Sequence, residues 1–501
     1  MSTSNSNAPI GAVIIARHGD RSGFYQNPTS YAASETVLTA LGEQQNFRLG
    51  QLMASIYAGS DESRAIAALS KTAFVDNQVN STADAGGEGA VIYDSALAFW
   101  QVRFYPPRLD AANTTLANGT AVQSPLNGYQ YVKVLTQLPE DDIDFEPWTN
   151  CQAWTNRTTD AHRGFADLSV AIQLYASPAY TARAEQDADL LELIRTSGLV
   201  GNRTVSIANF YNVWDYMNVN SIHNETFLEL LEQHGGAETL ARARDLANFH
   251  EYNLFTGSGS GDIGNFAGRT VFSRIIESLQ AFTQDDNDVH LTHYHFSCVS
   301  ATVKWFFDEY KPFLSIFNMT NIAASTNPTL QYPQGMVDYA SVGVFELRDG
   351  GSGSSGYDVR FGFRNGTETD DLTYYPLFGT DSVDMDLSTF VGNLDPYVIP
   401  NNTLWCDLCG NNGSVATCSE IYLAQEYEDL AAKYKDIADG HFTSVGSGFI
   451  GACVTIVVGL AVLGLMRALG WVHFGKRRPR ADDHYPLNDQ QSVKGSVQTQ
   501  M

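Results

Sequence analysis

Five consecutive residues near the N-terminus, Arg17-His18-Gly19-Asp20-Arg21, are the strongest candidates for chemistry in this chain. A histidine ring nitrogen can attack phosphorus and carry the phosphoryl group as a covalent intermediate. Arginines on either side supply planar, permanently charged donors that match phosphate oxygens and stabilise transition-state charge. Gly19 lets the backbone approach a phosphate closely. The motif predicts phosphoryl transfer, with His18 as nucleophile and Arg17 and Arg21 as phosphate ligands; the alternative is a solvated loop with a structural histidine.

The segments around this motif predict an α/β fold. Residues 12–16 (AVIIA) form a short apolar run, typical of a strand that is buried on both faces. Helical spacing follows at 38–57, and residues 180–200 and 225–247 are rich in good helix formers. Residues 335–365 alternate around a Gly/Ser turn, which is the pattern of a hairpin. Helices between two strand-rich ends indicate an α/β core with an inserted helical domain.

The motif and its surroundings resemble the histidine acid phosphatases, two-step phosphomonoesterases of the phosphoglycerate mutase-like superfamily with the signature Arg-His-Gly-x-Arg-x-Pro. Gly23 stands at the position of the proline. The resemblance implies a mixed sheet flanked by helices, an inserted mainly helical subdomain, and hydrolysis of small phosphoesters with no cofactor and no metal. The resemblance covers residues 10–400 approximately. Besides the motif, the residues that carry it are Leu38-Thr39, Gly42, Gln45 and Leu49-Gly50, the segment 94–107, and Ala340 and Phe345-Glu346-Leu347.

Two parts of the family's active site have no match here. The family places a third phosphate-binding arginine before the 94–107 segment, yet residues 72–102 contain neither arginine nor lysine. The family also has a histidine–carboxylate pair before a small apolar helix. One register puts Tyr310-Lys311 at that pair, which makes Lys311 a candidate phosphate ligand, and another puts His295-Phe296 there.

The first of these registers leaves residues 297–309 as an insertion between a strand-like segment at 289–296 and the apolar segment 312–319. We therefore expect 297–309 to be a surface excursion or a retained intron. Without the family's acid, Asp20, Asp308 and Glu309 are substitutes for protonating the leaving group, although an ordinary solvated carboxylate is the favoured interpretation of each.

Two functions follow from these matches and departures. The first is a phosphomonoester hydrolase of reduced activity that acts through phosphohistidine. The second is a family member without turnover, which binds a phosphate ligand or has a structural role at a surface. The loss of a general acid typically costs about 10²–10⁴-fold in rate, so the departures bear directly on this choice.

The charge balance limits the partners. The chain has 30 basic and 56 acidic residues, a net charge of −26. This argues against a surface for nucleic acid or anionic lipid, which would need a basic face. The predicted partner is a phosphoester small molecule, and no protein partner is predicted.

Residues 446–466 form a run of 21 residues without a charged side chain, about long enough to cross a bilayer core. Basic residues follow this run, which predicts a single-pass cell-membrane protein with an extracellular N-terminal domain and a cytoplasmic tail. The first 445 residues have a net charge of −29, with 24 basic and 53 acidic residues. An export signal is then expected upstream of residue 1. All ten glycosylation sequons precede the run: Asn80, Asn113, Asn118, Asn156, Asn202, Asn224, Asn318, Asn365, Asn401 and Asn412.

The cysteines outside this run favour disulfides over zinc, because the CDLC at 406–409 lacks a fourth nearby ligand. The candidates are Cys151, Cys406, Cys409 and Cys418, and the pairing is left open. The predicted organisation is an α/β core at 1–125 and 270–400, a helical insert at 126–269, a cysteine-containing stem at 401–445, a transmembrane helix at 446–470, and a polar tail at 471–501.

Overall fold

The computed structural model covers the whole chain, and its contacts form two compact units, Met1–Tyr422 and Leu423–Met501. Each unit is described separately. The residues that the structure describes are 8–27, 29–30, 36–84, 90–101, 105–108, 113–137, 142–158, 174–257, 262–284, 303–325, 330, 332–350, 353–411, 415–441 and 444–469.

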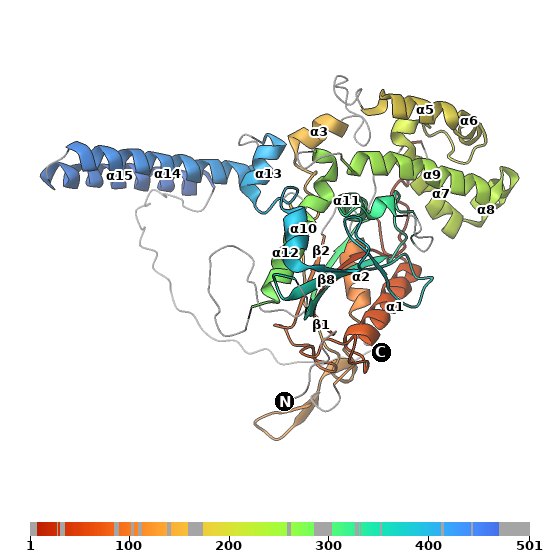
Figure 1. Cartoon of the computed structure of the whole chain (residues 1–501), viewed down its shortest axis with the longest axis horizontal. Helices are drawn as coiled ribbons and strands as arrows, with labels where there is room; N and C mark the ends of the chain where they lie inside the picture. Colours follow the sequence, from red (N-terminus) through yellow and green to blue (C-terminus); the bar gives the residue numbers. More distant parts are fainter. Residues whose placement is uncertain are drawn as a thin grey trace, which may run out of the picture. The chain divides into compact units, whose positions relative to one another are not determined.

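The first unit contains one eight-stranded mixed sheet (Figure 1). Its strand order is β10-β8-β7-β1-β6-β2-β5, with β9 paired to β8. The β1–β6, β6–β2 and β2–β5 pairs are parallel, and the remaining pairs are antiparallel. The strands are β1 Pro9–Arg17, β2 Val79–Ala83, β5 Val134–Leu135, β6 Val303–Asp308, β7 Val342–Asp349, β8 Tyr357–Arg364, β9 Thr373–Tyr375 and β10 Asp384–Asp386, with β3 Asn113–Thr115 and β4 Ala121–Gln123 in a separate hairpin.

Helices cover both faces of this sheet (Figure 1). The helices of the first unit are α1 Ala40–Tyr57, α2 Val91–Phe99, α3 Gln152–Thr158, α5 Pro178–Gln186, α6 Ala188–Thr196, α7 Phe210–His223, α8 Glu225–Gln233, α9 Gly236–Phe255, α10 Phe266–Ala281, α11 Lys311–Met319, α12 Leu387–Leu394 and α13 Asn402–Cys409.

Strand β1 is buried on both sides, as its apolar sequence predicted. Ala12, Ile14 and Ala16 pack with α1 and α2 on one face of the sheet. Val13 and Ile15 belong to the other core cluster, with residues of α10 and α12. This alternation follows from the twofold side-chain period of a strand, so β1 is held between two cores and its C-terminal end is rigidly placed.

Several predicted elements are confirmed. Helix α1 matches 38–57 and begins after Thr39, whose side chain accepts a hydrogen bond from the Gly42 N–H. The hairpin predicted at 335–365 is β7 and β8. The regions 180–200 and 225–247 are helical, each as two helices instead of one. Whether the helical region is a separate insert, as the predicted domain boundaries have it, stays a prediction.

The prediction for residues 297–309 is wrong for the part that the structure describes. Residues 303–308 are β6, which lies between β1 and β2 in the middle of the sheet. The side chains of Val303 and Phe306 are buried. Central parallel strands usually have a continuous apolar sequence. This strand was not predicted because its sequence contains Lys304, and two acidic residues come after Phe307. Residues 289–302 lie outside the described residues.

The second unit contains most of α14, Ala416–His441, and α15, Ser444–Ala468. Helix α14 occupies much of the predicted stem at 401–445. Within the described residues, no helix has both the length and the apolar character needed to cross a membrane. The side chains of 446–450 and residue 470, which belong to the predicted span at 446–470, lie outside the described residues, as does the predicted tail at 471–501. Both the span and the tail therefore stay predictions.

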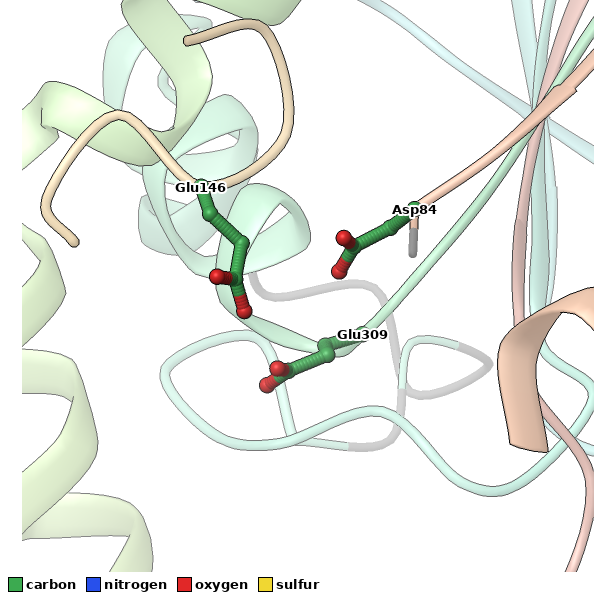
Figure 2. A group of neighbouring side chains, drawn as sticks. All are labelled: Asp84, Glu146 and Glu309. Atoms are coloured by element: carbon green, nitrogen blue, oxygen red, sulfur yellow. The ribbon is translucent and has the colours of Figure 1, made fainter. Parts of the chain in front are cut away.

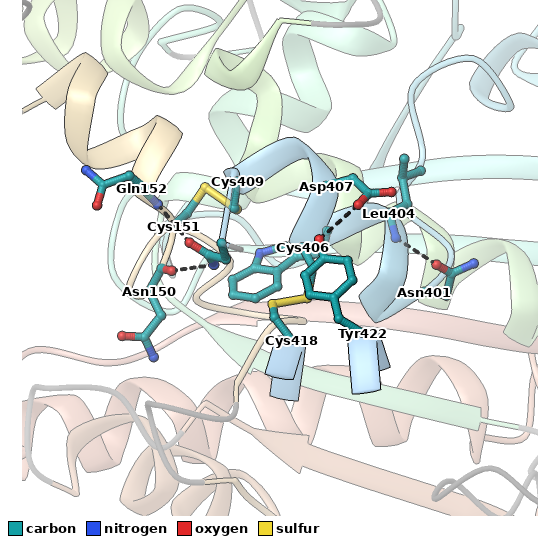
Figure 3. Close-up of a disulfide and its surroundings, with 12 residues drawn as sticks. Asn150, Cys151, Gln152, Asn401, Leu404, Cys406, Asp407, Cys409, Cys418 and Tyr422 are labelled. Atoms are coloured by element: carbon teal, nitrogen blue, oxygen red, sulfur yellow. Dashed lines mark hydrogen bonds between the residues drawn. A yellow bond between two sulfur atoms is a disulfide. The ribbon is translucent and has the colours of Figure 1, made fainter. Parts of the chain in front are cut away.

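One disulfide joins the segment after the sheet to an earlier part of the first unit, and a second lies within that segment (Figure 3). Cys151 pairs with Cys409, 258 residues later, and Cys406 pairs with Cys418. The side chains of all four cysteines are buried, and Trp405 beside them donates to the Pro147 carbonyl at 2.9 Å. The four predicted cysteines are thus the paired ones, in a pairing that the sequence left open.

We predict that replacing the long-range disulfide by Cys151→Ser with Cys409→Ser lowers the free energy of unfolding by about 2–5 kcal/mol, because the bond restricts a long loop in the unfolded chain. Denaturant unfolding under non-reducing conditions measures this. Cys453→Ser, at a cysteine that pairs with none of the described residues, is the control and should change little. Equal stability of the double variant and the control would contradict the prediction.

Candidate active site

Three parallel strands end side by side and bring the polar residues of the site together. Arg17 pairs with Asp308 across β1 and β6, and Ala83 pairs with Phe307 across β2 and β6. The next residues along these strands are His18, Glu309 and Asp84. Ligand sites of α/β sheets lie at this carboxyl edge. The sheet therefore places the predicted nucleophile beside carboxylates from two neighbouring strands.

His18 lies in the loop that leaves β1, and both of its backbone groups are fixed. Its N–H donates to the Asp308 carbonyl at 3.0 Å, and its carbonyl accepts from the Ala340 N–H at 3.0 Å. The ring Nδ1 is 2.7 Å from the Gly19 carbonyl oxygen. A carbonyl oxygen only accepts, so Nδ1 carries the proton and the lone pair is on Nε2. Burial first, and then the charges of Arg17 and Arg21, lower the pKa of His18 well below its usual value, which keeps the ring neutral and nucleophilic.

Arg17 is held between two aromatic rings. Its guanidinium carbon lies 5.1 Å from the ring centre of Tyr310 and 4.5 Å from that of Tyr339, and Nη1 donates to the Val337 carbonyl. The Tyr310 hydroxyl is itself fixed by donating to Glu251 at 2.8 Å. The Arg17 Nε is buried and has no hydrogen-bond acceptor among the described residues. A buried cationic donor in this state favours an anion as ligand.

Arg21 is committed to a carboxylate. Its guanidinium forms two hydrogen bonds to Asp215 of α7, at 3.1 and 3.4 Å, and both side chains are buried. Such a bidentate pair uses the same planar donors that a phosphate would need. The Nη1 and Nη2 donors of Arg21 can therefore bind a phosphate only if Asp215 shares or releases them.

The loop between the two arginines is anchored to α1. A Cβ on Gly19 would meet the Gly42 carbonyl at 2.4 Å, so the glycine is required by helix packing here, in addition to any approach to phosphate. Asp20 is fully buried, its backbone N–H donates to Gln45 at 2.8 Å, and its side chain accepts from Thr39. The expectation of a solvated Asp20 is wrong, because its carboxylate is part of this anchor.

Asp308 and Glu309 are also buried, at 1% and 3% exposure, so the expectation that these carboxylates are solvated is wrong too. They occupy the end of β6, beside His18. Tyr310 follows and packs against Arg17, while Lys311 begins α11 and its ammonium lies 2.6 Å from Glu309. The strand end opposite His18 therefore carries the Asp308-Glu309 pair, not Tyr310-Lys311, and His295-Phe296 lies outside the described residues.

Asp84 follows β2, in the stretch where no arginine could be found. Its carboxylate lies with those of Glu146 and Glu309, and one oxygen of each is within 4.8 Å of the others (Figure 2). Burial first, and then the charges of Glu146 and Asp308, raise the pKa of Asp84 well above its usual value. This edge of the site is thus strongly acidic.

Two cavities adjoin the loop. A cavity of about 210 Å³ is lined by Arg17 and Tyr339 from the sheet side and by Trp214 and Arg244 from α7 and α9. A larger one of about 890 Å³ reaches Asp215 and the end of α7. Arg244 adds a second guanidinium beside Arg17, although it pairs with Asp338 at 2.6 Å. The smaller cavity is therefore lined by two guanidinium groups, those of Arg17 and Arg244.

Sequence analysis missed Asp84, Glu146, Asp215, Arg244 and Tyr339. Asp215 had one signal, since a carboxylate between Trp214 and Tyr216 on a helix is unusual. The others come from segments far apart in the chain, and only the fold joins them.

The glycosylation sequons differ in accessibility. Asn80, Asn318 and Asn365 are partly buried, and Asn365 forms hydrogen bonds with Asp338 and Ser341. Asn412 and the side chain of Asn113 lie outside the described residues. The exposed asparagines are Asn118, Asn156, Asn202, Asn224 and Asn401.

No protein-family model matches this chain, and neither does any curated protein. Similar solved structures include the phytase from Citrobacter braakii, at 10% identity and a TM-score of 0.49 over 78% of this chain and 98% of that one. The Klebsiella sp ASR1 phytase has 12% identity and a TM-score of 0.49, over 78% and 95%. The multiple inositol polyphosphate phosphatase of Bifidobacterium longum has 12% identity and a TM-score of 0.42, over 80% and 95%. Similarity this distant gives the chain neither a family nor an activity, so its function must come from its own residues.

We predict that Asp215→Asn strengthens the binding of inorganic phosphate while weakening the fold. The substitution removes the carboxylate that holds Arg21, and breaking a buried ion pair costs about 3–5 kcal/mol of stability. Calorimetric titration with phosphate and denaturant unfolding measure the two effects. Asp371→Asn, which breaks the exposed pair with Arg64, is the control and should affect neither strongly. Unchanged or weaker phosphate binding in Asp215→Asn would count against Arg21 as a phosphate ligand.

Proposed function

We propose that this protein is a phosphomonoester hydrolase, similar in mechanism to the histidine acid phosphatases, which transfers the phosphoryl group to Nε2 of His18. The single observation that carries the proposal is the arrangement of His18 itself. Its Nδ1 proton is bound by the Gly19 carbonyl, its ring is kept neutral, and it lies between two arginines at the carboxyl edge of a parallel sheet. A structural histidine needs none of this.

In the first step the Nε2 lone pair attacks phosphorus, and the bond from phosphorus to the ester oxygen breaks. The leaving oxygen takes up a proton, for which the Asp308-Glu309 pair at the end of β6 is the nearest carboxyl source by strand position. Water then attacks phosphorus and gives a proton back to the same carboxylate, while the phosphorus–nitrogen bond breaks; this releases inorganic phosphate and restores Nε2 of His18. Arg17, with its buried Nε, stabilises the negative charge on the transferred group.

We propose that turnover is slow. Arg21 is shared with Asp215, and carboxylates stand where a phosphate site needs positive charge. The same observations favour a second candidate, a protein that binds phosphate esters without hydrolysing them. The two differ in whether His18 becomes phosphorylated.

Phosphatase assays on an aryl phosphate, together with rapid-quench labelling, test the proposal. We expect His18→Ala to lower turnover by at least about 10³-fold and to abolish labelling, because the nucleophile is lost. His234→Ala, at a histidine on the far end of α8, is the matched control. Because the pKa of His18 is lowered, its neutral form persists as the pH falls below about 6.5, and labelling should persist with it.

Turnover that survives His18→Ala would sink the mechanism. A folded chain that binds phosphate without labelling at any pH would leave the binding-only candidate. Labelling that already falls with a midpoint near 6.5 would contradict the environment described for His18.

We also propose that the chain is a single-pass glycoprotein of the cell surface. The proposal is supported by the apolar run at 446–466, the basic residues after it, and the ten sequons before it. Protease treatment of intact cells should release a fragment that ends before about residue 446 and shifts in mobility on deglycosylation. A fragment that is protected from protease, with no such shift, would overturn this placement.

A further inference from the structure

Three carboxylates, those of Asp84, Glu146 and Glu309, form a cluster, and the proposed reaction does not use the first two. They come from the end of β2, from the segment before α3 and from the end of β6. Figure 2 shows the Asp84 and Glu146 side chains extending toward one another, with Glu309 beside them. All three side chains are buried. Like charges at this distance repel strongly in a buried site unless a proton or a cation neutralises them.

Lys311 supplies one positive charge, at 2.6 Å from one oxygen of Glu309. A carboxylate can accept more than one ligand, so this ion pair does not by itself prevent Glu309 from binding a second cation. The ammonium also lies 4.7 Å from the ring centre of Trp148, which fixes it on that side of Glu309. Lys311 therefore neutralises the charge of Glu309. A further cation is needed to neutralise the charges of Asp84 and Glu146.

Two more buried carboxylates point to the same ligand. The side chains of Asp142 and Asp308 are 2% and 1% exposed, and Oδ2 of each has no hydrogen-bond partner among the described residues. Asp308 directly precedes Glu309, and both carboxylates lie close enough for their charges to act on the carboxyl of Asp84. Buried oxygens of this kind normally have a partner, and a cation is the ligand that several acceptors can share.

We propose that Asp84, Glu146 and Glu309 bind a divalent metal ion, for which Ca²⁺ is the best fit. Three oxygens within 4.8 Å of one another can all lie within about 2.8 Å of one centre, close to the range of about 2.3–2.6 Å for Ca²⁺. An all-oxygen, all-carboxylate set selects a hard cation over zinc or copper. Mg²⁺, at about 2.0–2.1 Å, would require a larger contraction of the cluster.

The position of the metal site suggests that the cation takes part in phosphate binding. This role depends on the proposed function. The cation would lie along the carboxyl edge that carries His18, where residues 72–102 supply no arginine. Without a cation, the carboxylates of the cluster repel an anionic phosphate ester. A bound cation would instead place positive charge next to the ester. The metal site would thus compensate for the missing cationic ligand.

Metal binding is tested on the purified full chain after treatment with a chelator, without substrate. We expect calorimetry to detect one Ca²⁺ per chain, and thermal unfolding to move to higher temperature with added Ca²⁺. Asp84→Asn and Glu146→Gln should each weaken binding at least tenfold. Asp94→Asn, a carboxylate of α2 outside the cluster, is the control and should bind as the unmodified chain does.

If the chain binds neither Ca²⁺ nor Mg²⁺ at pH 7, the proposal is wrong. The carboxylates of the cluster would then be neutralised by protonation. Binding that survives both cluster variants would also overturn it, because the ion would then lie elsewhere. Since these measurements need no turnover, they are distinct from the labelling test. If the chain binds Ca²⁺ at the cluster but never forms phosphohistidine, the hydrolase proposal is wrong and the metal-site proposal stands.

Discussion

The parallel pairing of β1, β6 and β2 is the constraint on which the site depends. It aligns three strand ends, and the hydrogen bond from the His18 N–H to the Asp308 carbonyl continues the pairing into the loop. Because β1 is packed between two hydrophobic cores, the position of His18 is set by the interior of the molecule. A shift of one residue in β6 would turn its side chains to the opposite face and remove the carboxylates from the nucleophile.

The second constraint is the balance of buried charge. Arg21 is matched by Asp215 and Lys311 by Glu309, whereas Arg17 is held by aromatic rings and a backbone carbonyl. Arg17 is thus available for an anion, since no carboxylate occupies its guanidinium in the described contacts. The carboxylates at the ends of β2 and β6 oppose that anion. The slow turnover and the cation site that we propose both follow from this excess of acidic groups.

The parts of the fold that could be predicted from the sequence have strong local signals. The apolar run of β1, the helical spacing of α1 and the alternation of β7 and β8 are each contained in a short window. The proposed nucleophile and its two arginines lie within five consecutive residues. Strand β6 was not predicted because acidic residues lie at its end. Acidic residues in a local sequence pattern usually indicate a solvated segment, whereas these are buried. The partners of the site, such as Asp215 and Asp84, are brought together by tertiary pairing that leaves no trace in sequence spacing.

The central claim is that the Gly19 carbonyl holds the proton of Nδ1 and leaves Nε2 of His18 to attack phosphorus. Identifying the phosphohistidine isomer on the peptide that contains His18, after rapid quench with a labelled phosphoester at neutral to alkaline pH, tests it most directly. The geometry predicts phosphorus on Nε2. Phosphorus on Nδ1, or a label on any other residue, would contradict the account.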